Sequence, residues 1–237
     1  MCSGAGNIRC ASADGSTVAS SDPNSDLTSD ASAQARAHNV DSFVILASMT
    51  SDSWAPTRSL LARAGVVLAP GLSDAEIAAA EVKFGFRFPP DLRSLLSVVL
   101  PTGSQFPAWR NLEDPGLADR WAWPFEGLAF DMMHNAYWRD AWGARPASHD
   151  AALLIARSAY DAAPKMIPIF GHRYLPDSPH AAGNPVYSIY QTDIIVYGNN
   201  LAAYFVAEFG RDPGGDRPDD VQPTHRPTTP FWSDFVE

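Results

Sequence analysis

The stretch that decides the fold covers residues 72–96 and reads LSDAEIAAAEVKFGFRFPPDLRSLL. It opens with a capping box, because the Ser73 hydroxyl and the Glu76 carboxylate can each satisfy a free backbone N–H at a helix start. Gly85 follows the apolar pattern and suits the left-handed turn that ends many helices. We therefore predict a first helix over residues 74–84.

A second helix is predicted to begin at Pro89 and Pro90, because a missing backbone N–H costs little at the first helical positions. Leucines spaced three and four residues apart give this helix a continuous apolar face. Pro101 and Gly103 are expected to stop it. Two short helices joined by a tight turn predict an αα-hairpin.

Short apolar runs farther along the chain predict strands. The segments 186–190 and 193–197 flank Gln191 and Thr192 and are expected to form a β-hairpin. Another strand is predicted over residues 165–170. Two shorter strands are expected around Trp121–Trp123 and Gly127–Phe130.

Two later helices are predicted over residues 150–162 and 200–209. The expected order places helices first, groups the strands and ends on a helix. That order is typical of an α+β domain, here an N-terminal αα-hairpin packed on a mainly antiparallel β-sheet with further helices. The domain is expected to cover residues 56–210.

The two ends of the chain differ from this domain in composition. Residues 1–55 are expected to form a disordered or weakly structured extension, since the first forty residues are rich in Ser, Ala, Asp and Asn and offer few large aliphatic and no aromatic side chains to bury. Residues 211–237 predict a Pro-rich tail. It ends in the aromatic residues Phe231, Trp232 and Phe235, which we expect to dock on the domain in preference to acting as a free peptide motif.

Composition and charge narrow the functional classes. The formal net charge of −10 disfavours a nucleic-acid partner and would suit a basic protein. The two cysteines, Cys2 and Cys10, provide neither a disulfide framework nor a four-ligand zinc site. The apolar run 43–49 is too short to span a membrane, and the chain opens with no secretory pattern. A cytoplasmic location without a membrane partner is expected, and the oligomeric state stays open.

Residues 72–96 resemble the N-terminal motif of the SUKH superfamily, which includes the Smi/Knr-type regulators of cell-wall synthesis. The later segments 167–172, 183–189 and 193–198 are similar to strands of that family. The resemblance covers about residues 70–210 and implies an α+β fold with a protein-binding role. Bacterial members are similar to toxin-immunity proteins, and fungal members act in cell-wall and signalling regulation. The resemblance implies no catalytic residues.

Candidate partner-binding residues fall in a segment rich in Trp and Arg and in a loop between strands. Trp, Tyr and Arg dominate protein interfaces, and loops on rigid scaffolds often carry function. Core packing of the tryptophans and a plain connecting role for the loop are the alternatives. The candidates are Trp138, Arg139, Trp142, Arg145, His172, Arg173, Tyr174 and Asn184.

An enzyme is the alternative to a binding module. A hydrolase could use His172 as base, Asp193 to orient it and Ser188 as nucleophile. The sequence has no Gly-x-Ser-x-Gly elbow to expose such a serine, and its histidines lack metal-binding spacing. We therefore expect a non-enzymatic protein-binding module, without cofactor or metal, in a toxin-immunity-like or regulatory role.

Overall fold

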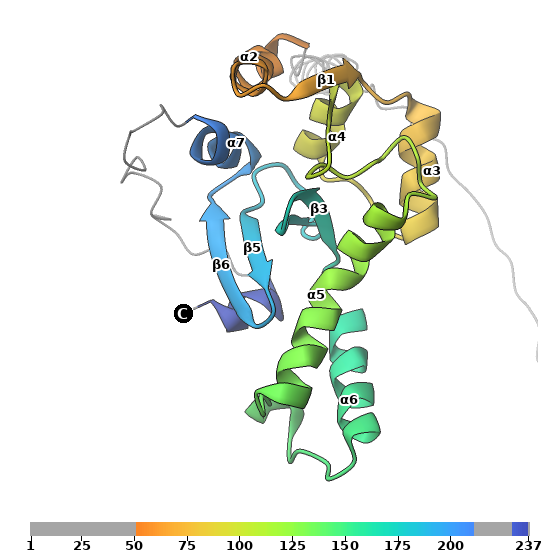
Figure 1. The fold of residues 1–237 in the computed structure, drawn as a ribbon, viewed down its shortest axis with the longest axis vertical. Helices are drawn as coiled ribbons and strands as arrows, with labels where there is room; N and C mark the ends of the chain where they lie inside the picture. Colours follow the sequence, from red (N-terminus) through yellow and green to blue (C-terminus); the bar gives the residue numbers. More distant parts are fainter. Residues whose placement is uncertain (1–50, 211–228, 237) are drawn as a thin grey trace, which may run out of the picture. The chain divides into compact units, whose positions relative to one another are not determined.

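The computed structural model describes residues 51–210 and 229–236 (Figure 1). Its helices and antiparallel strands confirm the predicted α+β class. None of the described helices combines the length and the apolar character needed to cross a membrane. In chain order the elements are η1 (Ser51–Trp54), α2 (Ala55–Arg63), β1 (Val67–Pro70), α3 (Asp74–Phe84), α4 (Pro90–Val98), β2 (Val99–Thr102), α5 (Pro115–His134), η2 (Asp140–Trp142), α6 (His149–Asp161), β3 (Met166–Phe170), β4 (Arg173–Pro176), β5 (Val186–Tyr190), β6 (Asp193–Gly198), α7 (Leu201–Phe209) and η4 (Trp232–Phe235).

The strands form two antiparallel sheets. β1 pairs with β2, and the larger sheet has the order β3-β4-β5-β6, in which each strand pairs with the next along the chain. The predicted hairpin is confirmed, with Tyr190 opposite Asp193 in the β5–β6 pair. Gln191 makes its turn with φ 57°, a left-handed conformation that is uncommon for a residue other than glycine.

Helix α3 has the predicted bounds and caps. The Ser73 backbone N–H donates to the Glu76 carboxylate at 2.8 Å, which completes the capping box. Gly85 ends the helix with φ 65°, in the left-handed region that favours glycine. The predicted αα-hairpin is not clearly formed. Strand β1 precedes α3, strand β2 directly follows α4, and these two strands pair with each other, so the two helices lie between paired strands in the chain.

Strand β2 also corrects the predicted stop of the second helix. The helix ends at Val98, and Pro101 lies inside β2, where it pairs with Leu68. Val99 already has extended backbone angles, φ −153° and ψ 140°. Adjacent β-branched valines favour that conformation, so the helix ends before the proline is reached.

Helix α5 is the largest departure from the sequence prediction. The segments around Trp121–Trp123 and Gly127–Phe130, predicted as strands, both lie in this single helix of 20 residues. Its buried positions include Leu117, Pro124 and Leu128, which recur at helical spacing and not in alternation. The strand prediction was wrong because aromatic residues and an internal proline concealed this period.

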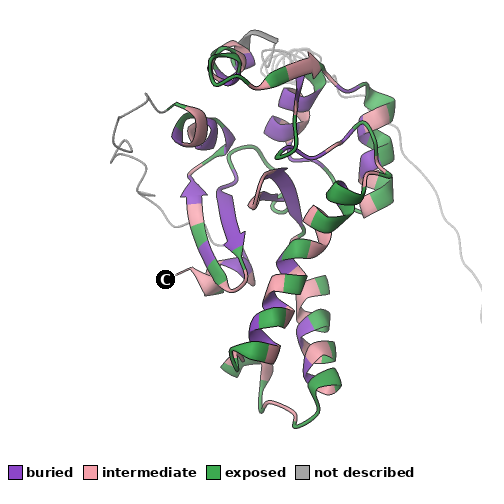
Figure 2. Cartoon of the chain, viewed as in Figure 1, coloured by how far each residue is buried: buried purple, intermediate pink, exposed green. Residues whose placement is uncertain are grey.

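Buried side chains form three clusters. Figure 2 colours the buried positions purple along the chain. The largest lies among α2, α3, α4, α7 and the large sheet, and its members include the fully buried Ile77 and Phe88. A second cluster covers β5 and β6 with the C-terminal segment, and the third joins α5 to α6. Burying each large aliphatic or aromatic side chain contributes about 1.5–3 kcal/mol, so these clusters hold the elements in place.

The C-terminal aromatic segment docks on the domain, as predicted. Trp232 is 2% exposed, and its indole N–H donates to the Pro164 carbonyl oxygen at 2.7 Å. The Tyr187 hydroxyl donates to the Thr229 hydroxyl at 2.9 Å inside the same cluster. Residues 211–228, which make up most of the predicted tail, lie outside the described residues, as do residues 1–50 of the predicted extension.

Candidate functional site

The first group of predicted site residues is engaged within the protein. The Trp138 and Trp142 rings are half-buried and meet edge to face, with centroids 5.3 Å apart. Arg139 forms an ion pair with Asp234 at 2.5 Å, and its guanidinium lies 4.9 Å from the Phe235 ring centroid. These contacts tie residues 137–142 to the C-terminal segment.

Arg145 and the backbone of residues 137–143 belong to the same region. Arg145 donates to the Met132 carbonyl oxygen and lies over the Trp138 ring at 5.9 Å. The segment from Tyr137 to Gly143 is no continuous helix and forms a 3-10 turn over residues 140–142 only. The aromatic and arginine side chains of residues 138–145 therefore contact one another and the C-terminal segment. We call this group the closed cluster.

Three residues of the predicted loop are also used internally. Arg173 donates to the Ser188 hydroxyl at 2.9 Å, and its guanidinium lies 3.9 Å from the Tyr197 ring centroid. Tyr174 is fully buried, and burial raises the pKa of its hydroxyl. Asn184 is buried and donates to backbone carbonyl oxygens of the 176–179 segment.

The residues of the hydrolase alternative do not assemble into a triad. The buried Ser188 hydroxyl accepts its hydrogen bond from Arg173, and Asp193 is exposed at the first position of β6. Within residues 51–210 and 229–236, no hydrogen bond links the side chains of His172, Asp193 and Ser188.

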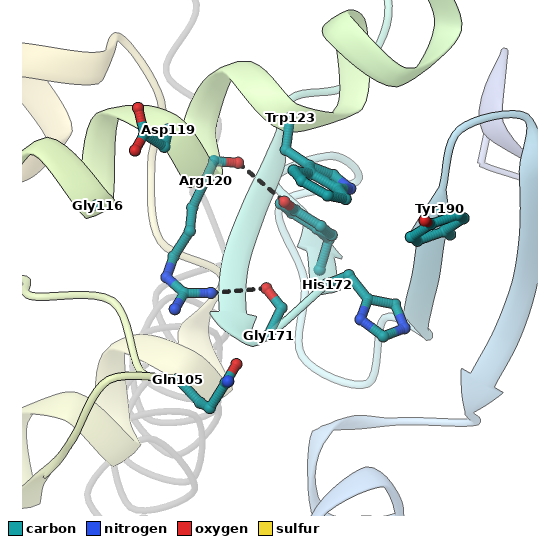
Figure 3. A pocket seen from close by; sticks show the side chains of 9 residues that line it. Gln105, Gly116, Asp119, Arg120, Trp123, Gly171, His172 and Tyr190 are labelled. Atoms are coloured by element: carbon teal, nitrogen blue, oxygen red, sulfur yellow. Dashed lines mark hydrogen bonds between the residues drawn. The ribbon is translucent and has the colours of Figure 1, made fainter. Parts of the chain in front are cut away.

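Two of the predicted residues, His172 and Tyr174, line an open pocket of about 360 Å³ (Figure 3). The pocket lies between the N-terminal half of α5, the loop that contains Gln105, the β3–β4 turn and the end of β5. Its lining residues are Gln105, Gly116, Asp119, Arg120, Trp123, Gly171, His172, Tyr174 and Tyr190.

Helix geometry explains the contribution of α5. Gly116, Asp119, Arg120 and Trp123 are spaced three, four and seven residues apart, so they share one face of the helix. The cap that starts this helix is Asp114, whose carboxylate accepts from the Leu117 backbone N–H at 3.1 Å. The start of α5 thus fixes which side chains reach the pocket.

Arg120 joins the pocket's walls. Its guanidinium donates to the Gly171 carbonyl oxygen at 2.9 Å and to the Ser104 carbonyl oxygen at 2.6 Å. Its own carbonyl oxygen accepts from the Tyr174 hydroxyl at 2.9 Å. In Figure 3 a dashed line marks the hydrogen bond from Arg120 to Gly171. One residue therefore links α5 to the β3–β4 turn and to the 103–105 loop.

Two aromatic side chains stand open at the rim. Trp123 is 41% exposed and Tyr190 is 53% exposed, and their ring centroids lie 6.0 Å apart. The Trp123 indole N–H donates to the Ile189 carbonyl oxygen at 3.2 Å, which fixes the ring against β5. The His172 ring lies 6.2 Å from the Tyr190 ring, so the three rings surround the opening in Figure 3.

His172 is neutral at pH 7. Burial lowers the pKa of its imidazole, and the neighbouring Arg173 guanidinium lowers it further. The rim of the pocket is thus made of uncharged rings.

The β5–β6 turn is fastened to α5 by polar and steric contacts. Asp131 accepts from the Thr192 backbone N–H at 2.9 Å and from the Thr192 hydroxyl at 2.6 Å. Burial opposes ionisation of Asp131, but these hydrogen bonds outweigh it and hold its pKa below the usual value. Gly127 faces the same turn, where a Cβ atom would lie 2.8 Å from the Gln191 Cα.

Sequence reasoning did not select Asp119, Trp123 or Tyr190 as site residues. Trp123 was placed on a predicted strand, which hides its neighbours at helical spacing. A capping signal at Asp114 followed by Pro115 was available to indicate the helix. With that helix, Asp119 and Trp123 fall on one face.

Comparison with known proteins gave no match: no family model and no curated protein matches the sequence, and no solved structure matches the fold. Within the described residues, no three His, Cys, Asp or Glu side chains gather closely enough to hold a metal ion. The resemblance of residues 72–96 to the SUKH superfamily stays a prediction.

Proposed function

We propose that this chain is a non-catalytic protein-binding module of the SUKH type, in a toxin-immunity-like or regulatory role. The observation that carries the proposal is the pair of exposed rings, Trp123 and Tyr190, at the rim of an open pocket. Trp and Tyr are the side chains most enriched at binding hot spots, where they fill or flank pockets on the partner.

The pocket is also preorganised. Hydrogen bonds from Trp123 to Ile189 and from Arg120 to the β3–β4 turn hold its walls before any partner arrives. Aromatic side chains fixed in this way lose little conformational freedom on binding, so more of their contact energy appears as affinity.

The placement of the hydrolase candidates supports the non-catalytic part of the proposal. The Ser188 hydroxyl is buried against Arg173, where a substrate carbonyl would not reach it. His172 faces the pocket, but Asp193 is not among its lining residues. A nucleophile and a base within hydrogen-bond reach are the minimum for that chemistry.

The proposal is tested by affinity capture with the full chain as bait. Wild type is compared with the Trp123→Ala/Tyr190→Ala double variant and with Leu154→Ala, which truncates an exposed apolar side chain on α6 away from the pocket. We expect a stoichiometric protein partner to be retained by wild type and by Leu154→Ala and lost with the double variant. The double variant is checked by circular dichroism to be folded. Recovery of the same amount of partner by this variant as by wild type would contradict the proposal.

A further inference from the structure

One acidic side chain in the pocket lacks a role inside the protein. Asp119 is exposed, lines the pocket and lies one helical turn before Trp123 on α5, so its carboxylate and the indole share a helix face. In the part of the chain that the structure describes, no side chain pairs with this carboxylate by hydrogen bond or ion pair. In Figure 3 Asp119 lies on α5 beyond Arg120, at the end of the pocket away from Tyr190.

We propose that this pocket accepts a basic side chain of the partner protein, with arginine preferred over lysine. The inference rests on the proposed protein-binding function and names the chemistry that the partner must present. The guanidinium lies against Trp123 and Tyr190, and the Asp119 carboxylate adds negative charge to the same pocket.

The aromatic rim suits a cation. The faces of Trp and Tyr rings carry partial negative charge and attract a cation held within about 6 Å of the ring centroid. The planes of Trp123 and Tyr190 are inclined at 56°, so a ligand at the rim can contact both rings. An arginine side chain has a planar head that stacks on rings and donates two parallel hydrogen bonds to a carboxylate, whereas the lysine ammonium is compact and strongly hydrated.

The two basic residues of the pocket do not oppose this assignment. His172 is uncharged at pH 7, because burial and then Arg173 lower its pKa, so its ring adds an uncharged wall. The Arg120 guanidinium donates to the carbonyl oxygens of Gly171 and Ser104, and these hydrogen bonds hold it against the wall of the pocket. In Figure 3 that guanidinium is turned toward Gly171, on the opposite side of the opening from Tyr190.

The charge of the whole chain favours the same partner. A formal net charge of −10 attracts a basic protein at long range and repels an acidic one. Complementary charge raises the rate of encounter, and the pocket then supplies a specific contact for one side chain. An anionic side chain would meet the Asp119 carboxylate and the negative ring faces, and is disfavoured on both counts.

The test uses the full chain and three short peptides, acetyl-Gly-Arg-Gly-amide and its counterparts with lysine or citrulline in place of arginine. Citrulline keeps the shape of arginine and removes its charge. Binding is followed by the NMR shift of the Trp123 indole N–H, identified by its loss in Trp123→Phe. We expect saturable shifts, with the citrulline peptide bound about tenfold more weakly than the arginine peptide, the value of one charged contact of about 1.4 kcal/mol. The lysine peptide is expected to fall between them.

Matched variants locate the contact. Asp119→Asn is expected to weaken the arginine peptide several-fold and to leave the citrulline peptide unchanged. Asp150→Asn removes the same charge from an exposed position on α6 and is expected to change neither. Equal binding of the arginine and citrulline peptides, no shift with any peptide, or an unchanged affinity in Asp119→Asn would each overturn the proposal.

These outcomes are separable from failure of the proposed function. If the captured partner is lost with Trp123→Ala/Tyr190→Ala but the arginine and citrulline peptides bind alike, the pocket binds a protein through other chemistry. If the double variant keeps the partner, the protein-binding function itself is assigned to the wrong surface.

Discussion

The closed aromatic cluster at the C-terminal segment and the open pocket on α5 are built from the same residue types. In the closed cluster, Arg139 pairs with Asp234 and lies over the Phe235 ring, and Trp232 is 2% exposed. In the open pocket, Trp123 and Tyr190 keep 41% and 53% of their surface exposed, respectively. The comparison teaches that Trp and Arg content indicates a candidate binding surface only where the rings are not already packed against other parts of the protein.

The largest expected effect is a difference in the free energy of unfolding between variants of the two regions. Trp232→Ala removes a buried indole and its hydrogen bond to Pro164, which should lower the free energy of unfolding by about 3–5 kcal/mol. Trp123→Ala removes a half-exposed ring and should cost about 1–2 kcal/mol. Urea unfolding of both variants measures the difference. Equal losses would show that Trp123 is as structural as Trp232 and would break the comparison.

The next effect concerns the support of the open pocket. Gly127→Ala would place a Cβ atom 2.8 Å from the Gln191 Cα, so the β5–β6 turn must move away from α5. Overpacking of this kind typically costs about 1–3 kcal/mol.

Thermal unfolding and the NMR shift of the Trp123 indole N–H report this change, because that group donates to Ile189 on β5. Ala129→Gly, on the same helix, measures the size of the helix-propensity effect with the opposite sign and without a clash, so that this effect can be subtracted. An unchanged melting temperature and indole shift in Gly127→Ala would contradict the close approach of turn and helix.

Asp131 tests the same contact between α5 and the β5–β6 turn through the pH dependence of stability. Its pKa is lower in the folded protein than in the unfolded chain, so its contribution to stability is present above the unfolded value and is lost as pH falls through the folded one. Asp131→Asn keeps the shape but leaves the Thr192 donors with a weaker acceptor, and should cost about 1–3 kcal/mol at pH 7. The gap between wild type and variant, measured by urea unfolding, is expected to narrow below pH 4. A gap that is constant with pH would contradict the ionised Asp131–Thr192 contact.

The smallest effect lies at the start of α3, outside both regions. The Ser73 backbone N–H and then Arg110 lower the pKa of Glu76 to about 2. Its capping contribution is therefore expected to persist above the ordinary value of 4.5 and to be lost between there and about pH 2. The side-chain carboxyl carbon of Glu76, followed by NMR during an acid titration, should report that midpoint, and an ordinary midpoint would refute the capping box in solution.

Local signals allowed much of the fold to be predicted from sequence. Ser73, Glu76 and Gly85 define α3 through contacts within a few residues, and the hairpin around Gln191 follows from two adjacent apolar runs. These signals are short-range, so the residues alone carry them. The predicted stop at Pro101 failed because α4 already ends at the two adjacent valines, and the chain then pairs with β1, a long-range contact that the proline does not indicate.

The candidate site was less accessible to sequence reasoning. His172 was selected, but the pocket it lines depends on Trp123 and Asp119, which come together only when α5 is recognised as a helix. The exposure of Tyr190 and the burial of Tyr174, on paired strands of one sheet, are set by tertiary packing. The sequence pattern does not show which aromatic side chain is buried in the folded protein and which is exposed.

Site-specific photo-crosslinking tests the central claim most directly. A photoreactive phenylalanine analogue is incorporated in the full chain at position 190, at the rim of the open pocket, or at position 137, beside the closed cluster. The account predicts a discrete crosslinked product with one protein from position 190 and none from position 137. A product from position 137 alone, or no product from position 190, would contradict the assignment of the open pocket as the binding surface.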